Sequence, residues 1–326
     1  MKSVLVDPTI LPYAQELRFA GVVCELITNS FELRALLSQL SHVENYQAGN
    51  RFGMRIVVNE SSLDPIEKPH FRGLRHVVTA SFGTGNIFIF DVLRRTLSAS
   101  ISRVAATDLR FWSEKLIPIS LGVLGAAMGL VPIHCACLER NGDGLLIAGM
   151  SGAGKSTLSV ALAQNGLSYV SDDWTYMSRH QSSLVAFGTS APVKLLPDAT
   201  NHFPSLANYR VHRSMNGELA YEVDIAEAFT VRVKKACEPR WLIFLERIPN
   251  CEVEFTSVAS SKARSYLNSS VERLPTELYE ASAMRDLTLE MVSRLPCWFL
   301  RYGGAPQVAA EYLVEFVANQ AREIFA

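Results

Sequence analysis

The chain has 326 residues, of which 48% are hydrophobic and 19% are charged. This balance is typical of a folded protein with a sizeable core and excludes a disordered chain. Lys and Arg number 31 against 32 Asp and Glu, so no overall charge favours nucleic acid or an acidic membrane as a partner. The length predicts two domains, at residues 1–110 and 111–326.

Residues 1–110 have the pattern of a small α+β domain. Ser30 is a suitable cap for a helix over residues 31–40, in which four leucines recur at helical spacing. This domain is a candidate for substrate recognition. The predicted strands are short β-rich runs between turn residues, at 21–28, 54–59, 74–82, 86–92 and 96–102.

A stretch without charge at residues 117–133 approaches the length of a membrane span. It contains Pro118, Pro132 and three glycines, so we expect a buried helix. Thr107 and Asp108 are cap candidates for a helical stretch that runs through Trp112 toward Leu130 and connects the two halves of the chain. No basic segment followed by an apolar run opens the sequence, and the six cysteines are scattered. We therefore expect a cytoplasmic protein with free thiols and no membrane partner.

The next segment predicts a phosphate-binding loop. Residues 133–139 and 145–149 read as a β-hairpin around an Asn-Gly-Asp-Gly turn, and the second strand leads into GMSGAGKST, with a helix beyond it that ends at Gly166. The loop matches G-x-x-x-x-G-K-[ST] in the required context between a strand and a helix. The residues expected to bind ATP are Gly149, Ser151, Gly152, Ala153, Gly154, Lys155, Ser156 and Thr157.

Each part of this loop has a chemical reason. Its glycines leave room for the backbone to curl, so that successive N–H groups face the phosphates. Lys155 supplies a positive charge, and the Ser156 hydroxyl is placed to ligate Mg²⁺.

Asp172 and Asp173 follow a predicted strand directly after the loop helix, and should lie beside the loop. One carboxylate could hold Mg²⁺ while the other accepts a hydroxyl proton, and we assign Asp173 to the metal. His134, expected on the strand paired with the loop strand, could approach the phosphates; the alternative is a structural histidine.

Strands again dominate up to about residue 258, and the tail is predicted to be helical. The further strands are expected at 168–177, 182–188, 192–196, 219–224, 241–246 and 253–258, and the tail helices at 260–267, 277–294 and 306–325.

His134, the loop and the Asp172-Asp173 pair occur in the order and at the separations of the catalytic domain of HPr kinase/phosphorylase, which this region resembles. The resemblance implies an α/β (α+β) chain with a mixed sheet of the phosphoenolpyruvate carboxykinase-type P-loop fold. It also implies catalytic roles for His134, Lys155, Asp172 and Asp173. The E-x-R-G-x-G signature of that family is absent, so neither HPr as substrate nor the reverse reaction is expected.

The expected function is a Mg-ATP-dependent kinase for a Ser or Thr hydroxyl. Similar kinases modify peptide precursors, so the resemblance favours a peptide or protein acceptor, and a homo-oligomer is a further expectation. Lys194, Arg210 or Arg213 could neutralise the transition state. The alternatives are a kinase of small-molecule hydroxyls, a carboxykinase-like enzyme and a non-catalytic ATP-sensing or scaffold protein.

Overall fold

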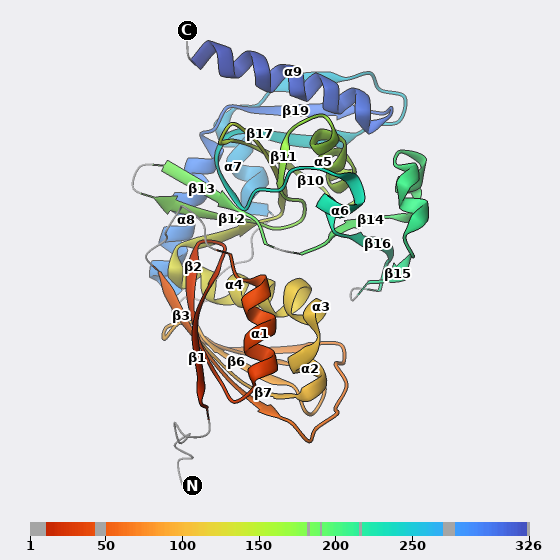
Figure 1. Ribbon diagram of the computed structural model, residues 1–326. Coiled ribbons are helices and arrows are strands. Elements are labelled where there is room, and N and C mark those ends of the chain that lie inside the picture. The colour runs from red at the N-terminus through yellow and green to blue at the C-terminus, as the bar shows by residue number, and fades with distance from the viewer. Residues whose placement is uncertain are drawn as a thin grey trace. The chain divides into compact units, whose positions relative to one another are not determined.

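The computed structural model describes residues 11–42, 50–180, 183–189, 191–214, 217–269 and 278–324. The protein is a mixed α/β protein with several mixed sheets (Figure 1). It divides into two compact units: the first is Met1–Val131 with Arg273–Asp286, and the second is Pro132–Glu272 with Leu287–Ala326. This division lies later in the chain than the boundary predicted near residue 110.

The first unit contains a seven-stranded sheet in the order β1-β2-β3-β7-β6-β5-β4. The pairs β2–β3 and β3–β7 are parallel and the others are antiparallel. The strand predicted at 74–82 is interrupted by a turn, so Leu74 is the last residue of one strand and Val77 the first residue of the next. The strands are β1 (Tyr13–Phe19), β2 (Val22–Thr28), β3 (Arg51–Asn59), β4 (His70–Leu74), β5 (Val77–Ser81), β6 (Ile87–Asp91) and β7 (Thr96–Ser102).

Helix α1 (Phe31–Leu40) is the predicted helix, and the Ser30 side chain accepts from the Leu33 N–H as expected of a cap. Its four predicted leucines are buried. The strand β1, which was not predicted, pairs with β2 along its whole length.

The connecting segment is only partly the helix that was predicted. The Asp108 side chain caps α3 (Leu109–Phe111), but the helical stretch ends at Met128, and residues 130–133 form a strand. No described helix is long and apolar enough to cross a membrane. The segment consists of α2 (Arg103–Thr107), α3, η2 (Trp112–Leu116), α4 (Ile117–Gly125), η3 (Ala126–Met128) and β8 (Leu130–Ile133).

The second unit is built on a nine-stranded mixed sheet, whose main path runs β11-β9-β10-β17-β13-β12-β8. The long strand β17 pairs with β13 near its start and with β19 over its second half. Its strands are β9 (Cys135–Arg140), β10 (Asp143–Gly149), β11 (Ser168–Ser171), β12 (Thr175–His180), β13 (Ser183–Phe187), β17 (Ala236–Arg247), β18 (Glu254–Ser257) and β19 (Cys297–Tyr302), with β8 at the end of the path.

A predicted hairpin and the predicted loop helix form the middle of this unit. Asn141 and Gly142 have φ values of 56° and 95°, and Arg140 pairs with Asp143, so β9 and β10 are joined by a two-residue turn. Helix α5 (Lys155–Gln164) follows. It ends at Gln164, two residues before the predicted end at Gly166. Gly166 has a φ of 98°, and its N–H and that of Leu167 bond back to the last turn, as expected of a C-terminal cap.

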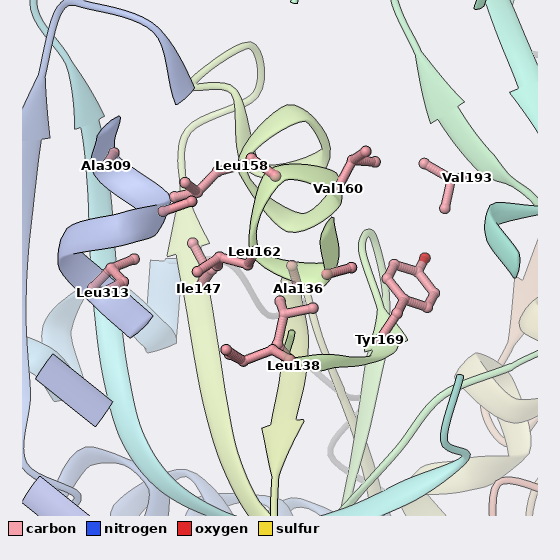
Figure 2. Close-up of a cluster of buried hydrophobic side chains, with 14 of the residues drawn as sticks. Ala136, Leu138, Ile147, Leu158, Val160, Leu162, Tyr169, Val193, Ala309 and Leu313 are labelled. Carbon is pink, nitrogen blue, oxygen red and sulfur yellow. The ribbon is translucent and has the colours of Figure 1, made fainter. Parts of the chain in front are cut away.

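One apolar cluster fixes α5 on the sheet. Leu158 and Leu162 of α5 pack with Ile147 of β10, Leu138 of β9 and Leu313 of α9 (Figure 2). All five side chains are completely buried. Because the start of α5 is also the end of the predicted phosphate loop, this packing holds the loop in place.

The tail is not wholly helical as predicted, because it contains strand β19 between its last two helices. Ser182, Glu277 and Phe325, at the ends of three predicted elements, lie outside the described residues. The remaining elements are the three-stranded sheet β14 (Val193–Leu195), β16 (Leu219–Val223) and β15 (His212–Arg213), together with η4 (Pro197–Asn201), η5 (Pro204–Asn208), α6 (Ile225–Phe229), α7 (Ser260–Ser269), α8 (Tyr279–Ser293) and α9 (Pro306–Ile324).

Candidate active site

The candidate site lies at one edge of the nine-stranded sheet. Strands β10 and β11 are both antiparallel to β9, and β17 is parallel to β10 and to β19. Four strands therefore end at this edge, and β9 begins there. Loops that follow the carboxyl ends of parallel strands are the usual location of ligand sites in α/β folds.

The predicted phosphate loop has the backbone geometry that its sequence requires. Gly152 and Gly154 have φ values of 79° and 90°, in the left-handed region that favours glycine. A Cβ on Gly149 would lie 2.7 Å from the Leu245 carbonyl oxygen of the neighbouring strand. The Ala153 N–H bonds to the Met150 carbonyl within the loop, and Ser151 is exposed. Ser156 and Thr157 are half-buried in the first turn of α5.

Lys155 is folded over this loop. Its Nζ donates to the carbonyl oxygens of Gly149 at 2.9 Å and Met150 at 3.2 Å. Burial lowers the pKa of Lys155, and the negative charges of Asp173 and Asp172 act in the opposite direction. A buried ammonium that is bound only to carbonyls in the described residues can bind an anion that enters the loop.

The turn between β11 and β12 carries Asp172 and Asp173 and is held against the start of β9. The Thr175 hydroxyl donates to the Cys135 carbonyl at 2.8 Å. Ser171 Oγ is 2.6 Å from Thr175 Oγ1, and because Thr175 uses its proton on Cys135, Ser171 is the donor in this pair. Both hydroxyls are buried, so the position of the turn is fixed from both of its ends.

Asp172 is the buried carboxylate of the pair. Its Oδ1 accepts from the Tyr169 hydroxyl at 2.9 Å, whereas Oδ2 has no hydrogen-bond partner of normal geometry among the described residues. Burial and the charge of Asp173 raise its pKa to about 6, although the Tyr169 hydroxyl, the Ser156 hydroxyl and the Lys194 backbone N–H favour the charged form. Ser156 and Lys194 thus lie close enough to Asp172 to lower its pKa, although neither makes a hydrogen bond of normal geometry to Oδ2.

Asp173 is exposed and pairs with His134. His134 Nε2 lies 2.9 Å from Asp173 Oδ1, and the Asp173 side chain is 65% exposed. His134 lies in the bend between β8 and β9, directly before the strand in which it was predicted. Its ring is 5.4 Å from the ring of Trp174. The structure therefore brings His134 and both aspartates together beside Lys155.

Two of the three cations expected to neutralise the transition state, Lys194 and Arg213, contact other residues. Lys194 Nζ lies 2.6 Å from Glu218 Oε2, and Arg213 donates to the Gly217 carbonyl within its own hairpin. Arg210 is exposed. Of these three cations, Lys194 acts on Asp172 through its backbone N–H.

Several residues at this edge were not predicted. Tyr169 and Thr175 belong to predicted strands but looked like ordinary β-formers in the sequence. Arg247 and Tyr302 lie at the ends of β17 and β19, far along the chain from the loop. The strand-end position of Arg247 after the apolar run 241–245 was the one sequence signal that could have identified it.

Comparisons with known proteins give a structural similarity at a low level of sequence identity. No family model and no curated protein matches the chain. Among solved structures, the chain is similar to the Hpr(Ser) kinase/phosphatase from Coxiella burnetii, with a TM-score of 0.33 and 13% sequence identity over 60% of this chain and 99% of that one. At this level the similarity carries no argument about function.

Proposed function

We propose that this protein is a kinase that transfers the γ-phosphate of Mg-ATP to a Ser or Thr hydroxyl of a peptide or protein. The observation that carries the proposal is the meeting of three groups at one sheet edge: a glycine loop with Lys155, the buried Asp172, and the exposed Asp173–His134 pair. Nucleotide binding alone requires only the first group.

The residues present fit a nucleotide and a magnesium ion. Gly152 and Gly154 leave the loop backbone open, and Lys155 supplies a cation. The Ser156 hydroxyl acts on Asp172, and Asp172 Oδ2 is buried without a partner among the described residues. No cluster of three or more His, Cys, Asp or Glu that could hold a metal occurs among those residues. The proposed Mg²⁺ would therefore take its remaining ligands from phosphate oxygens and water.

These contacts favour an exchange of roles between the two aspartates. The sequence-based assignment placed Mg²⁺ on Ser156 and Asp173, but it is Asp172 that lies beside Ser156. We therefore assign Ser156 and Asp172 to the metal. Bound there, Mg²⁺ would offset negative charge on the phosphates.

Asp173 is then the group that accepts the proton of the acceptor hydroxyl. It is exposed, so an acceptor can reach it, and the 2.9 Å contact with His134 orients its carboxylate. Lys155 binds phosphate oxygens and holds them next to this pair. We propose a peptide or protein acceptor because Asp173 is exposed and because the motifs resemble those of HPr kinase/phosphorylase. We propose no nucleic acid or membrane partner.

The test is a transfer assay with purified protein, Mg²⁺ and γ-labelled ATP. The acceptors are peptides encoded beside its gene, the same peptides with each Ser and Thr replaced by Ala, and small hydroxyl compounds. Label on a Ser or Thr that is lost in the Ala peptide supports the proposal. Label on the small compounds alone would indicate a metabolite kinase. Binding of ATP without any labelled acceptor, unaffected by Asp173→Asn, would instead indicate an ATP-sensing protein.

Lys155→Ala is expected to weaken ATP binding by about a hundredfold, because it removes a charged ligand from a partly dehydrated loop. Titration calorimetry with Mg-ATP measures this loss. The control is Lys262→Ala, which removes an exposed lysine of α7 that lies over the Phe299 ring. Unchanged ATP affinity in Lys155→Ala would contradict the assignment of the phosphate loop.

A further inference from the structure

Two side chains beside the phosphate loop have no part in the mechanism above. Arg247 is the last residue of β17 and Tyr302 the last residue of β19, and the two are direct partners in the parallel ladder. The same strand β17 pairs with the loop strand, Leu245 opposite Gly149. Arg247 and Tyr302 thus lie at the sheet edge where the phosphate loop begins.

Both side chains reach the loop. A Cβ built on Gly154 would lie 3.5 Å from the Tyr302 hydroxyl oxygen and 3.8 Å from Arg247 Nη1. Gly154 is the residue before Lys155 and the N-cap of α5. The atoms that come nearest are the polar ends of the two side chains, not their stems.

Tyr302 has a polar atom that needs a partner. The residue is 1% exposed, and its hydroxyl has no hydrogen-bond partner among the described residues. A buried hydroxyl without a partner destabilises the folded protein. Burial raises the pKa of Tyr302, against the opposing effect of the Arg247 charge, so the hydroxyl keeps its proton at neutral pH and remains a donor. An acceptor bound in the loop would satisfy it.

Arg247 is a cation without an ion pair in the described part of the chain. Its guanidinium lies 5.7 Å from the centre of the Tyr302 ring, which supports it from one side. The carboxylate before it in the chain, Glu246, is bound by Arg301 at 2.8 Å. The charge of Arg247 is therefore available to an anion at the loop.

We infer that Arg247 and Tyr302 form a second anion-binding arm of the phosphate loop, in which Arg247 contacts the polyphosphate of the bound nucleotide and Tyr302 positions Arg247 and donates a hydrogen bond. The inference rests on the proposed function only for the identity of the anion. The sheet order places this arm on the β17–β19 side of the loop, whereas Asp172, Asp173 and His134 come from the β9–β11 side. The phosphates are then held from both sides, with the planar guanidinium suited to two phosphate oxygens at once.

Titration calorimetry with Mg-ATP, Mg-tripolyphosphate and adenosine tests the inference in the full chain. Arg247→Gln is expected to weaken ATP and tripolyphosphate by about tenfold or more and to leave adenosine unchanged, because a charge-assisted contact to phosphate is lost. Arg247→Lys should recover part of the loss. The matched control is Arg240→Gln, which removes an exposed arginine from the same strand, where it pairs with Asp143 and Glu238.

Tyr302→Phe keeps the ring and removes the hydroxyl. It is expected to weaken tripolyphosphate binding by about threefold in the wild-type background and to have a smaller effect in Arg247→Gln, because the two residues act on one anion. A purely structural role would lower the melting temperature without this dependence on Arg247. Melting curves of all variants verify that they are folded.

The measurements distinguish a failure of the second arm from a failure of the proposed kinase function. If Arg247→Gln binds tripolyphosphate as tightly as the wild type while Lys155→Ala does not, the inference is wrong and the proposed function stands. If the wild type binds neither ATP nor tripolyphosphate, both are wrong. If the Arg247 and Tyr302 variants bind ATP and tripolyphosphate more weakly as expected but no acceptor is ever labelled, the second arm is supported and the kinase proposal fails.

Discussion

Asp172 and Asp173 are neighbours in the chain, but they have different environments. Asp172 is 8% exposed and bound by the Tyr169 hydroxyl, whereas the Asp173 side chain is 65% exposed and pairs with His134. Desolvation raises the pKa of the first carboxyl to about 6. These two environments support the proposed division of roles, in which Asp172 holds the cation and Asp173 meets the acceptor.

Asp172→Asn should stabilise the protein by about 1 to 2 kcal/mol at pH 7, because it removes a buried charge whose Oδ2 has no hydrogen-bond partner among the described residues. Urea unfolding measures this change. Asp173→Asn is the matched control and should change the free energy of unfolding by less than about 0.5 kcal/mol, since the side chain is mostly in water. Both variants should lose phosphoryl transfer. A destabilised Asp172→Asn would show that the carboxylate is better satisfied than its contacts indicate.

The turn between β11 and β12 shows how elements position these residues. Its place is determined by hydroxyl contacts from Ser171 to Thr175 and from Thr175 to the Cys135 carbonyl. Cys135 follows His134 directly, so one contact fixes the aspartate turn relative to the histidine. The separation between Asp173 and His134 therefore depends on a side chain outside both residues.

Thr175→Val keeps the shape of the side chain and removes its hydroxyl. We expect a loss of about 1 to 3 kcal/mol in the free energy of unfolding, because the Ser171 hydroxyl and the Cys135 carbonyl lose their partner. The rate of transfer should fall more than the affinity for ATP, since the loop itself is untouched. Ser178→Ala, on the same strand and away from the turn, is the control. Equal rates in the two variants would contradict a positioning role for Thr175.

At the scale of the whole molecule, the predicted site belongs to one unit. Every residue predicted to bind ATP or to act in catalysis lies in the second compact unit, Pro132–Glu272 with Leu287–Ala326. The first unit has its own aromatic core, in which Phe88 and Phe111 pack against Trp112. A role for the first unit in substrate recognition stays a prediction.

Trp112→Phe tests this separation. The Trp112 Nε1–H donates to the Ala105 carbonyl at 2.9 Å, so the change should cost about 1 to 3 kcal/mol of stability through a lost hydrogen bond and a small cavity. The melting temperature should fall while the affinity for Mg-ATP, measured well below that temperature, stays within twofold. A large loss of ATP affinity would show that the nucleotide site depends on the first unit.

Local patterns were sufficient for much of the second unit. The Asn141-Gly142 turn and the glycine loop have backbone requirements that few residue types meet, so their sequences predicted both. Strand β19 was missed because CWFLRY is a short apolar run between helices, and such a run does not distinguish a buried strand from a helix. The end of the segment 117–133 was assigned to a helix for the same reason.

The sequence by itself determined the backbone geometry of the predicted phosphate loop, the helix that follows it and the position of the aspartate pair after the next strand, because neighbouring residues and backbone preferences specify each of them. Only the tertiary structure decided which aspartate is buried, that Thr175 holds their turn beside His134, and that Arg247 and Tyr302 reach Gly154. These relations depend on strand order and register. Both arise from the packing of segments far apart in the chain, which no local pattern encodes.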